Sequence, residues 1–600
     1  MDIGRKLIKN HMNMEWHYSS EKNIQIVISL LKANNIKRVI ASPGTINLSL
    51  IASMMQDDWF NITSCVDERS AAYMACGMAA ETHEPVVISC TGATASRNYV
   101  PGLTEAYYRK LPVIAITATT SITRIGHLHQ QMMDRTKQFN DLVNLSVQVP
   151  VVNDAHTEWY CNMQVNKALS ECRRNGGGPV HINLETRDLR DFESGNLIST
   201  PVIRRIGYND VFPDMPLGRV VVYIGSHVAF SEEETELIDK FCGEKDSLVI
   251  CEHGSGYKGA YETSFSLVGS QEFYQSELRN VKLIIHIGEV AGDCDYASSI
   301  VADQVWRVSE DGEMRDPFRK LRYVFDMDVK TFFRHYAGDG NENKRDLYEA
   351  FQAERNSFLA KLNDIELPFS NIWLASKTSL KLPEGSVLHL GILNSFRSWN
   401  FFSIPKSVHA YCNSGGYGID GGPSTLIGAS LCNPEKLYFG VFGDLAFFYD
   451  LNSLGNHNVG KNLRVLLVNN GKGTEFRNYY HPWARFGEEA DKFGSAAGHF
   501  GNKNPNLVRH YAEDLGFEYM SASSKEEYIE KVEYWLDPAF RDKSIVFEVF
   551  TNSEDESNAL MLTRRLEINQ SLKLKQNVVN GIISLIGGEK ARAIKTILKI

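Results

Sequence analysis

LYFGVFGD, at residues 437–444, is an apolar run that ends in a glycine and an aspartate. A second apolar run, LRVLLVNNGKG at residues 463–473, ends in two asparagines and a glycine-rich turn. Residues 447–454 between them have a helical pattern, so the segment predicts a strand–helix–strand unit with parallel strands. Because α/β folds bind ligands at the carboxyl edge of such a sheet, we expect Asp444 and Asn470 to lie together there.

Asp444, Asn470 and the backbone carbonyl of Lys472 are the kinds of ligand that Mg²⁺ prefers. Carboxylate, amide and carbonyl oxygens are hard ligands, and diphosphate oxygens complete a six-coordinate shell. Gly443 is expected to let the backbone turn sharply, and the helix that follows to present free N–H groups to a phosphate. Taken singly, Gly-Asp is more often a turn and Asn-Asn-Gly a loop. Their position at two strand ends, one crossover apart, favours a cofactor site.

The composition of the whole chain sets the class of protein. Its 600 residues are enough for three or four domains, and 43% hydrophobic with 23% charged residues is typical of a globular protein. A net charge of −10 argues against a nucleic-acid partner, and the ten cysteines form no C-x-x-C pair that would indicate zinc or redox chemistry. The start of the chain lacks a secretory pattern and no run is apolar enough to span a membrane, so a cytoplasmic protein is expected.

Short apolar runs separated by helical stretches recur three times and predict an α/β fold of three successive doubly wound parallel-sheet domains. The expected domains are 17–195, 200–345 and 365–553, with linkers at 201–216 and 338–345 and a C-terminal tail at 554–600. The expected strands are 38–41, 63–66, 85–90, 112–117, 178–183, 219–225, 247–251, 281–288, 304–308, 386–390, 437–442, 463–468 and 544–550.

The end of the tail interleaves basic and aliphatic residues. Its basic residues are Lys573, Lys575, Lys590, Arg592, Lys595 and Lys599. The pattern fits a basic amphipathic helix on a membrane surface or a partner, and it also fits a helix packed on its own protein.

Glu68 is a candidate catalytic carboxylate. It follows the strand-like run 63–66 and begins a helix of small residues that extends to Ala80. A carboxylate in the first turn of a helix is also favoured simply by the helix dipole. The metal motif in the third domain raises the weight of the catalytic interpretation.

Several segments together resemble the SEPHCHC synthase (MenD) family of thiamine-diphosphate-dependent enzymes, which serves menaquinone biosynthesis. The likeness covers about residues 23–551. Its segments are SPG at 42–44, DERSAA at 67–72, CTG at 90–92, NYVP at 98–101, GIDG at 418–421, GDL at 443–445 and VNN at 468–470.

The resemblance implies pyrimidine, central and diphosphate domains, with thiamine diphosphate and Mg²⁺ as cofactors. It implies that Asp444, Asn470 and Lys472 hold the metal, and that Glu68 promotes the imino tautomer of the aminopyrimidine ring. Ile419 would support the bent form of the cofactor, and Gln130 or Gln131 would reach the reaction centre. The implied cofactor-binding residues are Gly44, Thr45, Glu68, Gly418, Ile419, Asp420, Gly443, Asp444, Leu445 and Asn470, where Leu445 replaces the family's usual glycine.

The positions that would bind substrate depart from the family, which grips the carboxylates of isochorismate and 2-oxoglutarate with arginines. Three of those arginines are replaced, at Ile46, in residues 118–121 and at Ser414. Each charge-assisted hydrogen bond contributes about 1.5 to 3 kcal/mol, so a changed substrate is expected. Arg397 lies near another family arginine and is a candidate to hold one carboxylate, and Ser414 and His481 are further candidate substrate contacts.

Glu475, just after the metal loop, is expected near the thiazolium ring of the cofactor. It is a candidate catalytic residue, either as a proton donor or as a ligand for a hydroxyl-rich substrate. The alternative is that it faces solvent on a surface loop.

The predicted activity is loss of CO₂ from a 2-oxo acid, followed by protonation or by joining to an acceptor. The alternatives are the SEPHCHC synthase reaction itself and a non-catalytic regulatory homologue. The resemblance also implies a homodimer or homotetramer in which Glu68 of one subunit and Asp444 of another share an active site.

Overall fold

The computed structural model describes residues 17–187, 191–293, 300–338, 340, 342–494 and 504–574. The chain divides into two compact units. The first runs to Gly207 and includes residues 312–315 and 321–324, and the second contains the remaining residues.

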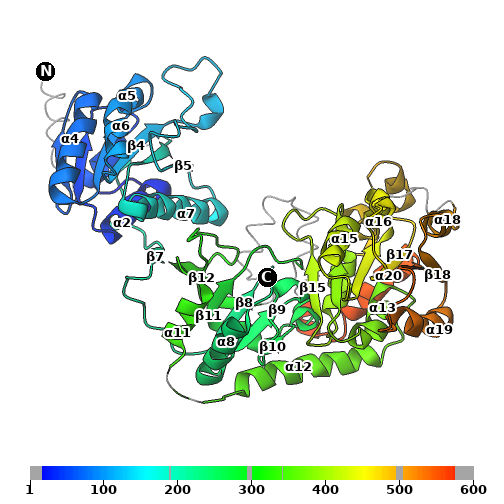
Figure 1. Ribbon diagram of the computed structural model, residues 1–600. Helices are drawn as coiled ribbons and strands as arrows, with labels where there is room; N and C mark the ends of the chain where they lie inside the picture. The colour runs from blue at the N-terminus through cyan, green and yellow to red at the C-terminus, as the bar shows by residue number, and fades with distance from the viewer. Residues whose placement is uncertain are drawn as a thin grey trace, which may run out of the picture. The chain divides into compact units, whose positions relative to one another are not determined.

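The first unit contains a six-stranded parallel sheet in the order β2-β1-β3-β4-β6-β5. Its strands are β1 (Arg38–Ala41), β2 (Asn61–Ser64), β3 (Val86–Cys90), β4 (Val113–Thr119), β5 (Leu145–Val149) and β6 (Val180–Glu185). Its helices are α2 (Lys22–Ala33), α3 (Leu48–Met55), α4 (Glu68–Thr82), α5 (Thr94–Asn98), α6 (Val100–Tyr108) and α7 (Ala155–Glu171) (Figure 1).

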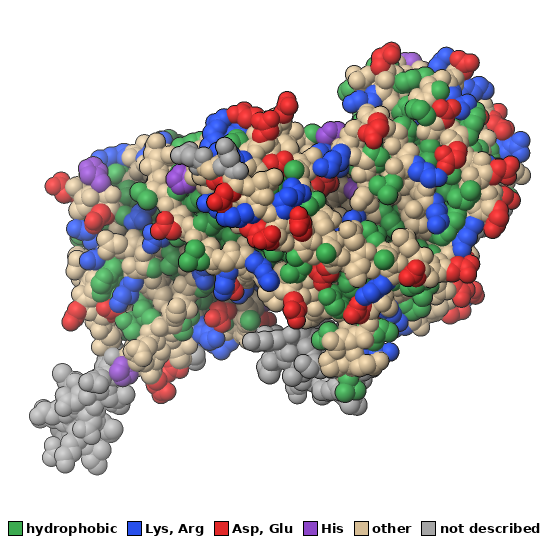
Figure 2. Space-filling view, turned by 90° about the horizontal axis from the view of Figure 1, so that it is seen from below, with side chains coloured by type: hydrophobic (Ala, Val, Ile, Leu, Met, Phe, Trp, Pro, Cys, Tyr) green, Lys and Arg blue, Asp and Glu red, His purple; other side chains and the backbone are tan. Residues whose placement is uncertain are grey.

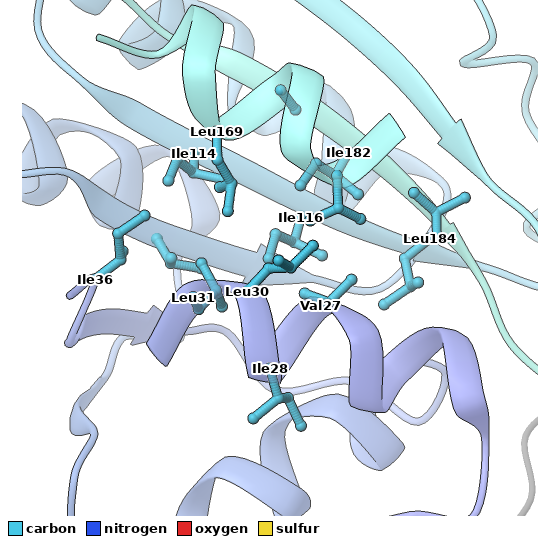
Figure 3. Packing of buried hydrophobic residues seen from close by; sticks show 14 of the residues in the cluster. Val27, Ile28, Leu30, Leu31, Ile36, Ile114, Ile116, Leu169, Ile182 and Leu184 are labelled. Atoms are coloured by element: carbon cyan, nitrogen blue, oxygen red, sulfur yellow. The ribbon is translucent and has the colours of Figure 1, made fainter. Parts of the chain in front are cut away.

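The core of this unit forms where α2 covers one face of the sheet. Val27 and Leu31 of α2 pack in one hydrophobic cluster with Ile116 of β4 and Ile182 of β6 (Figure 3). Leu169 of α7 belongs to the same cluster. Because full burial of one such side chain is worth about 1.5–3 kcal/mol, this packing fixes the strands and the loops at their ends.

The central sheet has seven strands in the order β10-β9-β8-β11-β12-β13-β7. They are β7 (Arg204–Ile206), β8 (Val220–Ile224), β9 (Leu248–Cys251), β10 (Glu262–Thr263), β11 (Asn280–Ile287), β12 (Val301–Val308) and β13 (Leu321–Phe325), with helices α8 (Glu232–Lys245), α9 (Ser266–Gly269) and α11 (Val329–Tyr336). Residues 201–216 are therefore not only a linker, because they contain β7. That strand has three residues and only Ile206 is buried, so no apolar run marks it.

The third sheet is parallel and has six strands in the order β15-β14-β16-β17-β19-β18. They are β14 (Val387–Leu390), β15 (His409–Cys412), β16 (Tyr438–Gly443), β17 (Leu463–Asn469), β18 (Glu518–Ala522) and β19 (Ile545–Phe550). The helices around it are α12 (Asp346–Asn363), α13 (Asn371–Thr378), α14 (Asn394–Asn400), α15 (Gly422–Cys432), α16 (Asp444–Tyr449), α18 (Leu507–Asp514), α19 (Lys525–Leu536) and α20 (Ser553–Thr563) (Figure 1).

Three parallel sheets with flanking helices confirm the predicted fold class. The predicted strands of the third domain are all present, while the edge strands β15 and β18 were not expected. Both are only partly buried and carry polar residues, so they lack the continuous apolar run that marks an inner parallel strand. The predicted domain boundaries remain predictions.

The predicted tail begins in the folded protein. Its first part is α20, whose Ala559 and Leu560 are buried, and Lys361 pairs with Glu567 just beyond it. The basic residues from Lys575 onward lie outside the described residues. On the face drawn in Figure 2, acidic and basic side chains are interspersed. Within the described ranges, none of the helices has the length and apolar character needed to cross a membrane.

Candidate functional site

The carboxyl ends of β16 and β17 meet, with Gly443 opposite Val468 in the parallel register. Asp444 follows directly and is only 2% exposed. Its Oδ1 accepts a hydrogen bond from the Leu445 N–H at 2.6 Å, and its Oδ2 accepts one from the Gly471 N–H at 2.6 Å. The carboxylate therefore ties the end of one strand to the loop that follows the next.

The two asparagines after β17 have different surroundings. Asn469 is buried and its Nδ2 donates to Glu548 Oε1 of β19 at 2.8 Å. Asn470 lies on the wall of a cavity, where its Oδ1 accepts from the Lys472 N–H at 3.2 Å. The Lys472 ammonium pairs with Asp491 at 3.0 Å, which leaves its backbone carbonyl as the group suited to a metal.

This cavity has a volume of about 220 Å³ and lies within the second unit, between the strand edge and α14. Seven residues predicted from the sequence line it, namely Ile419, Gly443, Asp444, Leu445, Asn470, Lys472 and Glu475. Sequence reasoning missed Asn371, Asn394, Ser395 and Thr474, which also line it. They come from α13, α14 and the loop after β17, and no spacing in the sequence links them.

The predicted reason for Gly443 was wrong. Its φ of −70° and ψ of 159° are open to any residue, so the turn does not need glycine. A Cβ at this position would meet no atom within 4 Å, because the residue faces the cavity. The glycine leaves room for a ligand to approach the backbone.

The expected phosphate contact at the start of α16 also needs revision. The helix has six residues, and its Leu445 N–H is already used by the Asp444 carboxylate. Since the helix is short, we assign no dipole contribution to the site.

The segment GIDG forms a second wall. Gly418, Ile419 and Asp420 line a small hollow together with His389. Of these four residues, Ile419 also lines the main cavity. A Cβ on Gly418 would lie 2.4 Å from Asp420 Oδ1, so a larger residue here would displace this carboxylate. Ser414 is 3% exposed and lines neither space.

Glu475 does not face solvent on a surface loop. Its carboxylate forms a two-pronged ion pair with Arg397, with Oε2 3.0 Å from Nη1 and Oε1 3.3 Å from Nη2. The Tyr480 hydroxyl donates to Oε1 at 2.7 Å and Asn478 Nδ2 donates to Oε2 at 3.2 Å. Burial opposes ionisation, but the charge and hydrogen bonds of Arg397 and the Tyr480 hydrogen bond lower the pKa of Glu475.

His481 does not line the cavity itself, although it contacts Phe476, which does. Its Nδ1 accepts from the Trp483 N–H at 3.2 Å and its ring lies edge-on to Phe476. These contacts indicate a capping residue at the start of the next short helix.

The remaining predicted residues belong to the first unit. Glu68 is the first residue of α4 and is partly buried, and Asn98 Nδ2 donates to its Oε2 at 3.3 Å. The N-cap role falls to Asp67, which accepts from the Arg69 N–H, so Glu68 is not needed as the cap.

Two loops of the first unit carry the other candidates. A Cβ on Gly44, next to the candidate Thr45 in the chain, would lie 2.5 Å from Thr91 Cβ, so only glycine fits against Thr91 here. Gln130 and Gln131 are exposed, and Gln131 has a φ of 60°.

The residues of the third domain fit a diphosphate and a hard cation. A buried carboxylate, an amide oxygen and a loop carbonyl stand at adjoining strand ends beside an open space. The described residues contain no cluster of three His, Cys, Asp or Glu side chains that could hold a metal. A metal bound here would therefore take amide, carbonyl and diphosphate oxygens beside the single carboxylate of Asp444.

Residues 22–139 match the family described as thiamine pyrophosphate enzyme, N-terminal TPP binding domain. This match and the three parallel sheets are consistent with a thiamine pyrophosphate enzyme, and they imply thiamine diphosphate with Mg²⁺ as the cofactor. Over most of its length the chain is a divergent relative of proteins named 2-succinyl-5-enolpyruvyl-6-hydroxy-3-cyclohexene-1-carboxylate synthase.

Three of these relatives show how far the sequences have diverged. The protein from Bacteroides thetaiotaomicron is 29% identical over 90% of this chain and 98% of its own length. The one from Christiangramia forsetii is 26% identical over 86% of this chain and 93% of its own. The one from Desulfotalea psychrophila is 27% identical over 75% of this chain and 85% of its own length.

Proposed function

We propose that this chain removes CO₂ from a 2-oxo acid and then protonates the product or joins it to an acceptor. The observation that carries the proposal is the buried Asp444 beside Asn470 at the joined ends of β16 and β17, on the wall of a cavity. Thiamine diphosphate, when bound, supplies the carbanion chemistry.

The chain's own residues would bind, orient and activate. Asp444, the Asn470 side chain and the Lys472 carbonyl would hold Mg²⁺, while Gly443 leaves room for the diphosphate. Ile419 would support the rings of the cofactor from the GIDG wall. Glu68 would hydrogen-bond the aminopyrimidine ring, and Gln130 would lie at the reaction centre.

We propose a homodimer or homotetramer in which the first unit of one subunit completes the cavity of another. The surface next to Glu68 supports this, because Val66 is 76% exposed, Tyr73 47% and Met74 39%. Apolar side chains gathered near a polar functional residue are typical of a surface that another protein covers.

The substrate is proposed to differ from that of the synthases, since three expected arginines are replaced and Arg397 is paired with Glu475. The second candidate is the synthase reaction itself. The comparisons support it more directly than a changed substrate, because all three relatives carry the synthase name.

Calorimetric titration of the apo-protein with thiamine diphosphate, with and without Mg²⁺, tests the cofactor site. We expect Mg²⁺-dependent binding that Asp444→Ala weakens by at least about 100-fold, since even groups that only support a metal ligand contribute 10–100-fold. Asp542→Ala, on an exposed aspartate of the same domain, is the matched control and should bind as the wild type does. Equal affinity in Asp444→Ala would contradict the site.

Release of CO₂ from a series of 2-oxo acids then tests the reaction. The second candidate predicts turnover of 2-oxoglutarate only with isochorismate as acceptor. Tight cofactor binding without turnover of any 2-oxo acid would favour the non-catalytic homologue.

A further inference from the structure

The cavity wall at Glu475 contains a carboxylate that is part of a buried ion pair. Arg397 and Glu475 are both largely buried, with side chains 13% and 19% exposed, and they face each other through two hydrogen bonds. A guanidinium engaged in this way has its planar edge filled by an internal carboxylate. This edge of Arg397 is therefore not available to a carboxylate of a ligand.

The Glu475 carboxylate is held in its ionised form by four donors. Two come from Arg397, one from the Tyr480 hydroxyl and one from the Asn478 amide. Its lowered pKa follows from these contacts, although burial alone would raise it. A carboxylate that stays ionised is poorly suited to donate a proton, which argues against the first role expected for this residue.

The other two cations on the neighbouring loop share one carboxylate. Lys472 Nζ lies 3.0 Å from Asp491 Oδ2, and Arg477 pairs with the same carboxylate. Of the three cations, Arg397, Lys472 and Arg477, only Lys472 lines the cavity, and its ammonium is paired with Asp491.

Uncharged polar groups complete the wall. Thr474 is 5% exposed, and no described residue hydrogen-bonds its hydroxyl. Asn371 Nδ2 donates to Ser395 Oγ at 3.0 Å, and both side chains, like Asn394, line the same cavity. Hydroxyl and amide groups of this kind pair with ligand hydroxyls.

We infer that one part of the cavity wall receives an uncharged, hydroxyl-bearing end of the substrate and excludes a carboxylate there. This part, the Glu475 wall, consists of Glu475, Thr474, Asn371, Asn394 and Ser395. The inference rests on the proposed function, since it names the chemical class of the 2-oxo acid or acceptor that the cavity takes. A ligand carboxylate at this wall would meet the negative charge of Glu475, while Arg397 and Lys472 are already paired with carboxylates of the chain. A ligand hydroxyl can pair with the Thr474 hydroxyl, which has no partner among the described residues.

Binding of glutarate, an unreactive dicarboxylate, tests the charge balance without any turnover. Titration calorimetry and the glutarate-dependent shift in Tm are measured on wild type, Glu475→Ala, Glu475→Gln, Arg397→Met and the double variant Glu475→Ala/Arg397→Met. We expect Glu475→Ala to bind glutarate at least about tenfold more tightly than wild type, because it releases Arg397, and the double variant to lose the gain. If Glu475→Ala does not fold, Glu475→Gln tests the charge in the same titration.

Glu489→Gln is the matched control, since it removes a charge from an exposed pair with Lys492 on the following segment and should leave glutarate binding unchanged. The inference is overturned if wild type binds glutarate and Arg397→Met abolishes it, or if neither Glu475 variant gains affinity.

Substrate preference supplies an independent readout. We expect wild type to favour 2-oxo-5-hydroxypentanoate over 2-oxoglutarate by at least about tenfold in kcat/KM, and Glu475→Ala to reverse that order. A preference of the wild type for 2-oxoglutarate would contradict the inference. If no 2-oxo acid is turned over, the proposed function fails, and the glutarate titration still decides the charge of the wall.

Discussion

Asp444 and Glu475 are carboxylates on the wall of one cavity, but their partners suit them to different tasks. Asp444 accepts hydrogen bonds from two backbone N–H groups that fix its direction at the strand edge. Glu475 has its charge matched by an arginine, so it shapes the electrostatics of the wall. A carboxylate is thus suited to bind a metal or to set specificity according to what surrounds it.

Glu68 is the residue whose proposed role is catalytic activation. Glu68→Gln keeps the size of the side chain but removes the acid, so we expect kcat to fall by about 10²–10⁴-fold while thiamine diphosphate still binds. Turnover and calorimetric binding, measured on the same preparation, separate the two effects. Asp67→Asn, at the adjoining N-cap, is the control and should lower Tm slightly without a comparable loss of kcat. Full activity in Glu68→Gln would contradict the proposed role.

At the scale of elements, α13, α14 and α20 meet at the buried Glu556. Its carboxylate accepts from the Asn371 N–H at 3.0 and 3.1 Å and from the Thr551 hydroxyl at 2.8 Å, and Asn394 Nδ2 lies 3.4 Å away. Asn371 and Asn394 line the cavity, so Glu556 joins α20 to the wall of the site.

Glu556 also makes the stability of the apo-protein depend on pH. Burial raises its pKa from 4.5 to about 7. Between these values the folded protein holds a proton that the unfolded chain has released, so the free energy of unfolding falls as pH rises from about 4.5 to about 7 and is then level. The loss is at most about 3 kcal/mol.

Urea unfolding of wild type and Glu556→Gln at several pH values between 5 and 8 measures this effect. We expect the wild type to lose stability relative to the variant as pH rises, because only the wild type titrates at this position. Glu554→Gln, on an exposed residue of the same helix, should follow the wild type at every pH. A pH-independent difference between wild type and Glu556→Gln would show that the carboxyl group does not titrate in this range.

At the scale of the whole molecule, the proposed sharing of sites between subunits can be tested by mixing. Glu68→Gln and Asp444→Ala each inactivate every site of their own homo-oligomer. If the two residues come from different subunits, a mixed dimer has one site with both defects and one intact site. Co-expression in equal amounts should then restore about 25% of wild-type activity, since half of the dimers are mixed and half of their sites are intact. No recovery, in a sample shown to contain mixed oligomers, would place both residues in one chain.

Local patterns in the sequence determined the class of fold and the positions of most inner strands. The runs that end at Asp444 and Asn470 predicted two adjacent parallel strands, and the alternation of apolar and helical segments predicted the three sheets, because inner parallel strands must be apolar on both faces. The edge strands β7, β15 and β18 carry no such pattern, and their place came from pairing with neighbours.

Only the tertiary structure decided the chemistry of the wall. Arg397 and Glu475 are 78 residues apart in sequence, and both were candidates for separate roles, yet the fold joins them as an ion pair. Glu556 and Asn371 are brought together across 185 residues in the same way. Strand and helix periods depend on neighbours within a few positions, whereas the charge and pKa of a buried group depend on whatever the fold places beside it.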